Sequence, residues 1–265
     1  MNQQNKERFN KLKKFGYFSK GLIYTLIGVL AALVAFGFNG NIRSQAEIVN
    51  PISKLPGGEI LNIIIGLGLI SYCVYRFYAA IVDPLYHGDK KRVRIRAVHA
   101  YTGALYLILA ISFIKPILNM ESSADLSSEK AALDLILSKS YGIYLIWVIA
   151  ISMAGNAIWQ FYLGYSGIYM VQVDDEPTGK EYGFVKKTGK FGYMARGVVF
   201  GVISFFMVKV ALHKNSDAYE GTEGAFEYLL NLTYGPFLMG TVAFGMIGYG
   251  LFCIMVARYS NLTKY

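Results

Sequence analysis

Arg76 is the residue of this sequence whose surroundings most suggest chemistry, because it lies inside a long apolar segment, Ile60 to Val82. A charged side chain among lipid tails costs roughly 2.5 to 3.5 kcal/mol on insertion scales, so such a residue is a functional candidate by default. Arg76 is also about seven residues from the cytoplasmic end of its segment, near enough for its long side chain to reach water. Both interpretations stay open, a functional cation and a snorkelling one.

Two later apolar segments repeat the surroundings of Arg76. Tyr72 and Arg76 are four residues apart and therefore share one helix face. Matched positions of the three segments form three layers: Gly68, Ser152 and Gly245; then Tyr72, Asn156 and Tyr249; then Arg76, Gln160 and Cys253. Around a common axis, such layers could line a polar pathway with a cationic constriction, suited to an anion or a small polar solute. Small and amide side chains also form packing seams between helices in lipid, and we favour such a seam.

A second set of matched residues lies where three other apolar segments begin. The set consists of Tyr17, Lys20, His99, Thr102, Tyr193 and Arg196. Aromatic and basic side chains are enriched where helices meet the membrane surface. We therefore expect these residues to anchor the cytoplasmic interface rather than to form a ligand site.

The sequence offers few parts for an enzyme. We find no pair of acids within the membrane, no histidine cluster at metal-ligand spacing and no nucleophile with a base in register. Cys73 and Cys253 both fall inside apolar segments and are best read as small apolar residues. His99 would be the one membrane-embedded axial ligand for a haem. We therefore expect no enzymatic activity, no metal site and no cofactor.

Composition explains why membrane-spanning helices must position these residues. Of 265 residues, 54% are hydrophobic and 16% are charged, and the hydrophobic residues come in long runs. Crossing a hydrocarbon core of roughly 30 Å takes about 20 apolar residues in a helix. We predict an all-α polytopic membrane protein with six transmembrane helices. The predicted spans are Phe15 to Phe38, Ile60 to Val82, Ala97 to Leu118, Tyr141 to Tyr165, Phe191 to Leu212 and Tyr234 to Arg258.

The six spans form three tandem repeats. The stretch Lys14 to Tyr24, KFGYFSKGLIY, returns as Lys190 to Phe200, KFGYMARGVVF, and more faintly as Arg96 to Tyr106, RAVHAYTGALY. Offsets between matched first helices, 82 and 94, nearly equal those between matched second helices, 84 and 93. Such repetition indicates three copies of one helical hairpin. Because each hairpin crosses the membrane twice, we expect all three to point the same way around a pseudo-threefold axis.

Short helices are predicted in the outer loops of the second and third hairpins. Ser128 is a suitable cap with Glu129 in the first turn, and Thr222 repeats this arrangement. Apolar residues follow at helical spacing: Ala132, Leu133, Ile136 and Leu137 in one loop, and Phe226, Leu229 and Leu230 in the other. We expect both helices at the membrane interface. Pro51 and Pro56 interrupt the corresponding loop of the first hairpin, where we expect irregular backbone.

The distribution of basic residues predicts the orientation. Lysines and arginines gather before the first span, in 83–96, in 171–196 and from 258 onward, which predicts that both chain ends are cytoplasmic. This bias accounts for the net charge of +9, so we expect anionic lipid head groups as partners and no nucleic acid. The predicted parts are a basic N-terminus (1–14), repeat 1 (15–88), repeat 2 (89–170), a charged cytoplasmic linker (171–190), repeat 3 (191–258) and a C-terminus (259–265).

The repeated motif resembles that of a bacterial membrane family called domain of unknown function 1206. Its first helices read basic, aromatic, Gly, Tyr, any residue, small, basic, Gly, as in Lys14 to Gly21 and Lys190 to Gly197. The resemblance covers Lys14 to Arg258, and repeat 2 departs from the motif at Ala97, Val98, His99 and Thr102. It implies three pairs of spans in a bacterial cytoplasmic (inner) membrane, and it brings no catalytic residues.

Two functional classes fit this sequence. We expect a non-enzymatic accessory or scaffold protein that contacts lipids and other membrane proteins, since glycine and aromatic residues are frequent and buried charges are few. The alternative is a channel or transporter for a small solute, such as an anion, with Arg76, Asn156 and Gln160 along its path. We call the three layers of matched residues that include Arg76 the stripe. A stripe that faces a hydrated cavity would favour transport, whereas burial against the neighbouring first helix would favour packing.

Overall fold

The computed structural model describes residues 3–38, 57–82, 92–114, 129–173, 175, 177–219 and 221–259. Over these residues the chain is all-α, with eight α-helices and no strand. The helices are α1 (Gln3–Ala35), α3 (Gly58–Val82), α4 (Arg92–Ile114), α5 (Glu129–Leu137), α6 (Gly142–Ser166), α7 (Gly179–His213), α8 (Thr222–Leu230) and α9 (Gly235–Arg258). Two short 3-10 helices, η1 (Ile168–Gln172) and η2 (Ser216–Ala218), follow α6 and α7.

Five helices are long and apolar enough to cross a membrane. The candidate spans are Glu7–Ala35 in α1, Gly58–Ile81 in α3, Gly142–Ser166 in α6, Gly179–His213 in α7 and Gly235–Arg258 in α9. They confirm five of the six predicted spans and make the chain a multi-pass membrane protein. The apolar stretch of α4, Arg96–Ile111, is shorter. The span from Ala97 to Leu118 therefore stays a prediction, and its end lies outside the described residues.

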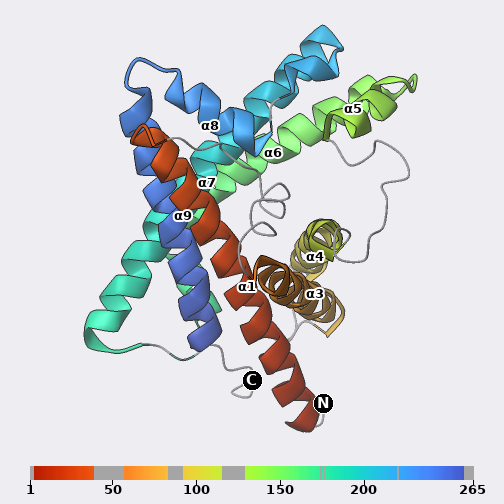
Figure 1. Cartoon of the computed structure of the whole chain (residues 1–265). Helices are drawn as coiled ribbons and strands as arrows, with labels where there is room; N and C mark the ends of the chain where they lie inside the picture. The colour runs from red at the N-terminus through yellow and green to blue at the C-terminus, as the bar shows by residue number, and fades with distance from the viewer. Residues whose placement is uncertain are drawn as a thin grey trace.

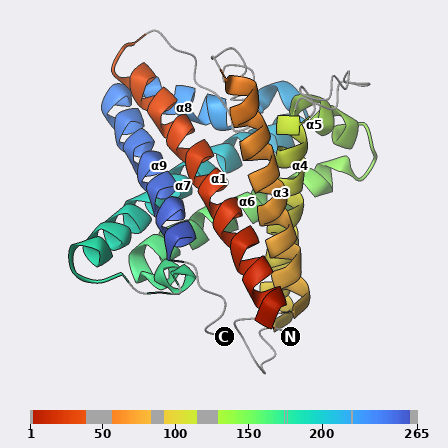
Figure 2. The same cartoon turned by 60° about the horizontal axis from the view of Figure 1, so that its bottom comes forward.

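The bundle has two distinct ends (Figure 1). The start of α1 and the end of α9 lie at one end, which we call the terminal side. The short helices α5 and α8 lie at the opposite end, which we call the loop side. Figure 2 shows the same arrangement after a turn of 60°.

The long helices pack in the order α4, α3, α1, α9, α7, α6. Figures 1 and 2 show α1 and α9 side by side, so the first helix of repeat 1 contacts the last helix of repeat 3. In repeats 1 and 3 the two helices of the hairpin also pack on each other, α1 on α3 and α7 on α9. Repeat 2 is different, because α4 packs on α3 and α6 packs on α7. Within the described residues, α4 and α6 share no extensive contact.

A glycine of the repeated motif explains the close helix pairs. A Cβ atom at Gly16 would lie 2.6 Å from the Cα of Tyr72, and one at Gly192 would lie 2.5 Å from the Cα of Tyr249. Only a residue without a Cβ permits so close an approach of two helices. Repeat 2 carries Val98 at the matched position, and its side chain is 56% exposed. The missing glycine is a physical reason for the separation of α4 from α6.

Two helices extend beyond the predicted spans on the terminal side. α1 begins at Gln3 and α7 at Gly179, so most of the predicted basic N-terminus and the second half of the predicted linker are helical. Exposed basic side chains cover these extensions: Arg8, Lys11, Lys180, Lys186, Lys187 and Lys190. Glu181 of α7 accepts a hydrogen bond from Tyr259 and pairs with Arg258 at 3.7 Å, which joins the start of α7 to the end of α9.

Both predicted short helices are present on the loop side. Thr222 is the first helical residue of α8 rather than its cap, because Gly221 takes the cap position and no side chain caps the helix. The Ser216 hydroxyl donates to Oδ1 of Asp134 at 2.5 Å, which joins η2 to α5. Outside the described residues lie the predicted cap Ser128 and the loop prolines Pro51 and Pro56.

Candidate functional site: a buried centre of cations and tyrosines

Lys20 of α1 lies among tyrosine rings in the interior of the bundle. Its side chain is 4% exposed. Its Nζ lies 5.0 to 6.0 Å from five ring centroids, those of Tyr17, Tyr24, Tyr72, Tyr106 and Tyr249. It also donates to the Tyr72 hydroxyl at 3.4 Å. Lys20 is fifteen residues from the loop-side end of α1, which is about 22 Å along a helix, so the ammonium lies well within the apolar span.

A second cation, Arg196, enters the same space from α7. The centre of its guanidinium lies 4.4 Å from the Tyr249 ring centroid and 5.2 Å from that of Tyr24. Both rings are also neighbours of Lys20. The Nε of Arg196 is buried and has no hydrogen-bond acceptor. Contacts with ring faces stabilise a cation by about 0.5 to 2 kcal/mol, but they leave this donor unsatisfied.

A third cation, Arg76 of α3, completes the group. Its Nε donates to the Tyr72 hydroxyl at 2.8 Å, so Tyr72 accepts from both Arg76 and Lys20. A terminal guanidinium nitrogen lies 2.6 Å from Nδ1 of His99. Because a guanidinium only donates, Nδ1 is the acceptor, and the neutral imidazole carries its proton on Nε2. We call Lys20, Arg76 and Arg196 the cationic centre.

The tyrosines beside the cationic centre repeat their geometry in repeats 1 and 3. Tyr17 and Tyr72 meet edge to face with centroids 5.1 Å apart and an interplanar angle of 88°. Tyr193 and Tyr249 do the same at 5.2 Å and 86°. Such contacts are a favoured arrangement of aromatic pairs. In each case the motif glycine before the first tyrosine brings the two helices together, so one motif builds two walls of the centre.

The 3-10 helix η1 covers the terminal side of the cationic centre. Gln172 accepts a hydrogen bond from Tyr17 at 3.1 Å and donates one to Tyr193 at 2.7 Å, so it bridges repeats 1 and 3. Tyr169 stacks on Tyr193 with centroids 5.3 Å apart and donates to the backbone oxygen of Lys186 at 2.6 Å. Burial raises the pKa of the Tyr169 hydroxyl above its ordinary value.

The loop side of the cationic centre is closed as well. The hydroxyls of Tyr24 and Tyr106 lie 3.3 Å apart and form a hydrogen bond across the interior. Beyond them lie apolar side chains that are at most 1% exposed: Ile27, Ile65, Ala110 and Phe113. Polar side chains therefore form the middle of the bundle, and side chains close it at both ends.

No acidic side chain compensates the cationic centre in the described part of the chain. Over those residues, the hydrogen bonds and ring contacts of Lys20, Arg76 and Arg196 go to tyrosine, phenylalanine and histidine. The ion pair between Arg258 and Glu181 lies at the terminal side, where both side chains are exposed. Three positive charges thus share an interior that lacks a described counter-charge. Chemically, this arrangement is suited to an anion.

The predicted stripe on α3 and α9 both packs and reaches the centre. A Cβ at Gly68 or Gly245 would meet Ser19 or Ala195 of the neighbouring first helix, so these two positions are packing contacts. The tyrosines one turn further along each helix reach Lys20 with their rings. Cys253 is a fully buried free thiol.

The stripe residues of repeat 2 are placed differently. Ser152 is exposed, Asn156 is half-buried and Gln160 is 6% exposed. The Gln160 Nε2 donates to Oδ1 of Asn156 at 3.2 Å, and its Oε1 is buried without a donor. At these positions repeat 2 thus has an amide oxygen without a donor, whereas repeat 1 has Tyr72 and Arg76 and repeat 3 has Tyr249 and Cys253.

The expected interface anchors differ most from the prediction. Tyr17, Lys20 and Tyr193 are at most 4% exposed, and Arg196 lies over the ring of Tyr249. Four of the six residues therefore lie inside the bundle. The physical reason is helical spacing, because positions 17, 20 and 24 share the face of α1 that turns inward. Of the other two, His99 contacts Arg76, and Thr102 donates to the backbone oxygen of Val98 at an exposed site.

Three residues of the centre are absent from the predicted site: Tyr24, Tyr106 and Gln172. The first two occupy the last aromatic position of the repeated motif, seven residues after Tyr17 and His99. This spacing places them on the same helix face, which is a signal that sequence alone carries. Gln172 follows α6 in the predicted charged linker, and no repeat or periodicity indicates its role.

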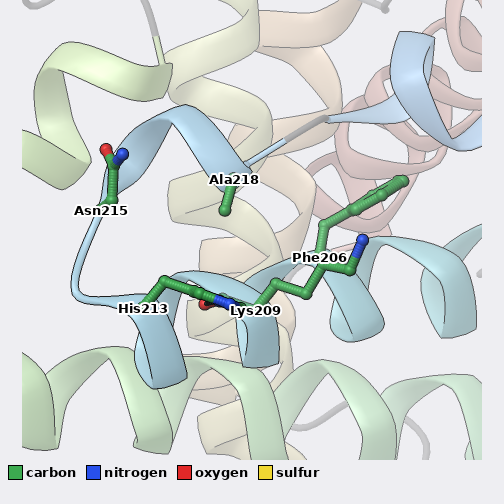
Figure 3. Close-up of a pocket in the computed structure, with 5 residues that line it drawn as sticks. All are labelled: Phe206, Lys209, His213, Asn215 and Ala218. Carbon is green, nitrogen blue, oxygen red and sulfur yellow. Dashed lines mark hydrogen bonds between the residues drawn. The ribbon is translucent and has the colours of Figure 1, made fainter.

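A separate cavity of about 430 Å³ lies on the loop side, between α7 and η2. Figure 3 shows its five lining side chains: Phe206, Lys209, His213, Asn215 and Ala218. The Lys209 ammonium lies over the rings of Phe205 and Phe206, and Asn215 accepts from the backbone of Asp217. Its polar groups thus have partners within the protein, whereas the Nε of Arg196 in the cationic centre has none.

The sequence matches one protein family three times. The family model described as Domain of Unknown Function (DUF1206) matches residues 15–83, 97–167 and 191–260, which confirms the predicted repeats and the resemblance. A relative from Bacillus subtilis (strain 168), named uncharacterized protein YxxB, is 28% identical over 263 residues. The match covers 98% of this chain and 94% of the relative. No solved structure matches.

Proposed function

We propose that this chain, which belongs to the DUF1206 family, is a non-enzymatic protein of the bacterial cytoplasmic membrane that binds an anion at its cationic centre. One observation carries the proposal. Lys20, Arg76 and Arg196 come from three different helices, share tyrosine neighbours and pair with no acidic side chain of the described chain.

The energetics of three cations inside the bundle support a bound anion. Each cation within a membrane span costs roughly 2.5 to 3.5 kcal/mol on insertion scales. Contacts with ring faces offset only part of this insertion cost, at about 0.5 to 2 kcal/mol each. Like charges also repel strongly where the dielectric constant is low. An anion between the cations would relieve this repulsion and would accept the hydrogen bond that the Nε of Arg196 lacks.

The closed ends of the interior favour binding over conduction. Gln172 and Tyr169 cover the terminal side of the centre, and the hydroxyl pair of Tyr24 and Tyr106 lies toward the loop side. A conducting pore needs a wetted path through both ends. The small residues of the stripe also pack on first helices, which supports the accessory role rather than transport.

The remaining surfaces fit a protein that works with lipids. The exposed lysines and Arg8 on the helical extensions of α1 and α7 would meet anionic head groups if the terminal side is cytoplasmic, as the charge bias predicts. Across the described ranges, no group of three or more His, Cys, Asp and Glu residues could hold a metal ion.

Thermal unfolding of the detergent-purified full chain tests the proposal. The probes are sodium phosphate, sodium sulfate, glycerol 3-phosphate and dioctanoyl phosphatidylglycerol, each at constant ionic strength. A ligand at a hundred times its dissociation constant stabilises a protein by about 2.7 kcal/mol, which raises the unfolding midpoint by several degrees. We expect at least one anion to do this for the wild type and not for Arg196→Met.

Lys209→Met is the matched control, because Lys209 is a cation over aromatic rings but lies outside the centre. We expect this variant to respond to anions like the wild type. A wild type that no probe stabilises, or a response that survives in both Lys20→Met and Arg196→Met, would overturn the proposal.

A further inference from the structure

We infer that the anion is the phosphate of a membrane phospholipid, with a hydroxyl-bearing and uncharged head group, which reaches the cationic centre sideways between α4 and α6. The inference rests on the proposed function and names the class of ligand. Its first support is the closure of both ends of the interior. Lipid reaches the centre through the side of the bundle, where no hydrophilic entrance is needed.

Among the helices that the structure describes, the side between α4 and α6 is the one junction without close helix packing. Each of the other neighbouring pairs of long helices is in extensive contact. The residue that would bring α4 against α6 in the manner of repeats 1 and 3 is Val98 instead of glycine. α6 is also the least buried of the five candidate spans. An acyl chain can therefore lie along α4 and α6 where the helices of the other repeats contact each other.

The side chains that α4 and α6 expose suit acyl chains. They are apolar or aromatic: Val98, Tyr101 and Leu105 on α4, and Ile151, Ile158 and Trp159 on α6. A lipid with its phosphate among the cations would place its tails on this apolar surface. A free phosphate ion would gain nothing from these contacts, because the hydrophobic effect stabilises only the buried apolar groups.

Two unsatisfied polar groups specify the head group. Arg196 offers a buried Nε donor, and the Gln160 amide offers a buried atom without a partner. They lie at the same level of the bundle, because the ring of Phe161, next to Gln160, faces Gly197, next to Arg196. A phosphate oxygen accepts from the guanidinium, and a hydroxyl of the head group donates to the amide.

Charge complementarity excludes the zwitterionic lipids. An ammonium or choline on the head group would bring a fourth positive charge beside Lys20, Arg76 and Arg196. Like charges at short range oppose binding, and specificity often rests on such repulsion. Phosphatidylglycerol has the required anion and hydroxyls and lacks the ammonium.

Ligand competition on the detergent-purified full chain tests the inference. Apparent dissociation constants come from thermal-shift titrations with four probes: dioctanoyl phosphatidylglycerol, dioctanoyl phosphatidylcholine, glycerol 3-phosphate and inorganic phosphate. We expect phosphatidylglycerol to bind at least about tenfold more tightly than each of the other three, since a charge-assisted hydrogen bond or a buried tail contributes that much. If glycerol 3-phosphate or phosphate binds as tightly as phosphatidylglycerol, the lipid inference falls while the proposed function stands. If no anion binds, both fall.

Two variants at the unsatisfied groups test the geometry. Gln160→Leu should weaken phosphatidylglycerol several-fold and leave dioctanoyl phosphatidic acid, which has no head-group hydroxyl of glycerol, unchanged. Arg196→Lys keeps the charge but loses the Nε donor, so it should weaken both lipids. Lys209→Met is the control and should weaken neither. Equal loss of both lipids in Gln160→Leu would overturn the assignment of the hydroxyl, and this readout does not depend on the variant's basal stability.

Discussion

Repeats 1 and 3 differ from repeat 2 in how their two helices meet. In repeats 1 and 3, Gly16 and Gly192 let the first helix touch the backbone of a tyrosine on the second. In repeat 2 the matched pair is Val98 and Asn156, and the two helices pack on neighbours instead of on each other. The residue at this motif position, glycine or valine, thus decides whether the two helices of a hairpin pack on each other. The open repeat is also the one that supplies no cation to the centre.

Gly16 and Gly192, where the two helices of a hairpin meet, should be the positions least tolerant of a side chain. Gly192→Val, which copies the residue of repeat 2, would place a Cβ within 2.5 Å of the Tyr249 backbone. Because backbone cannot move aside as a side chain can, we expect a loss of about 3 kcal/mol or more, or no folded protein. Yield and size-exclusion behaviour after detergent extraction measure the effect.

Gly155→Ala is the matched control for that experiment, because a Cβ at Gly155 meets nothing within 4 Å. This substitution should be neutral or stabilising by up to about 1 kcal/mol, since alanine favours a helix more than glycine does. Equal behaviour of the two variants would contradict the role given to the motif glycine.

Removing the Lys20 ammonium should abolish the response to the ligand without lowering the stability of the ligand-free protein. In buffer without a binding anion, Lys20→Met should unfold at the same temperature as the wild type or higher, because an uncompensated buried charge is replaced by an apolar side chain of similar length. With dioctanoyl phosphatidylglycerol only the wild type should gain stability. A variant that is several degrees less stable without ligand, yet still responds to it, would show that Lys20 acts through packing.

The bridge from Gln172 should protect the centre from the terminal side. Gln172→Leu loses the hydrogen bonds to Tyr17 and Tyr193, which we expect to cost about 1 to 2 kcal/mol. Cys253 lies four residues after Tyr249 on α9 and is a fully buried free thiol. The rate at which a maleimide labels it in a Cys73→Ala background therefore reports opening of the bundle interior. Labelling should be faster in Gln172→Leu than in the parent. His213→Leu on the loop side is the control, and equal rates in all three proteins would contradict the bridge.

The smallest effect is expected where repeat 2 already lacks contact. Val98→Gly removes an exposed side chain from α4, so it should cost only about 0.5 to 1 kcal/mol, through helix propensity. Thermal unfolding measures it directly. A loss as large as that of Gly192→Val would mean that Val98 packs within the bundle as tightly as the glycines of repeats 1 and 3.

Much of the fold could be predicted from the sequence, because hydrophobic length and repetition are strong signals. Five spans and both short helices appear as expected, whereas the helix ends differ, because α1 and α7 begin well before the predicted spans. Polar residues in a helical extension carry no hydrophobic signal. The sequence shows that repeat 2 departs from the motif at Val98. The effect of this residue on packing depends on contacts between different repeats, which the sequence does not show.

The candidate site was harder to predict than the fold. Arg76 and the tyrosines of the stripe were recognised because a charge inside a span is conspicuous. Lys20 and Arg196 sit near the start of apolar segments, where basic residues usually meet the membrane surface. Their place inside the bundle follows from the helical extension of α1 and α7 and from the face they share with inward tyrosines. Neither can be read from one helix taken alone.

An experimental density map of the protein in nanodiscs that contain phosphatidylglycerol is the most direct test of an anion at the cationic centre. The account predicts tetrahedral density within hydrogen-bond distance of the Lys20 ammonium and the Nε of Arg196, continuous with density for tails between α4 and α6. Tyrosine rings packed around all three cations, with no density between them and no phosphorus retained by the purified protein, would contradict it.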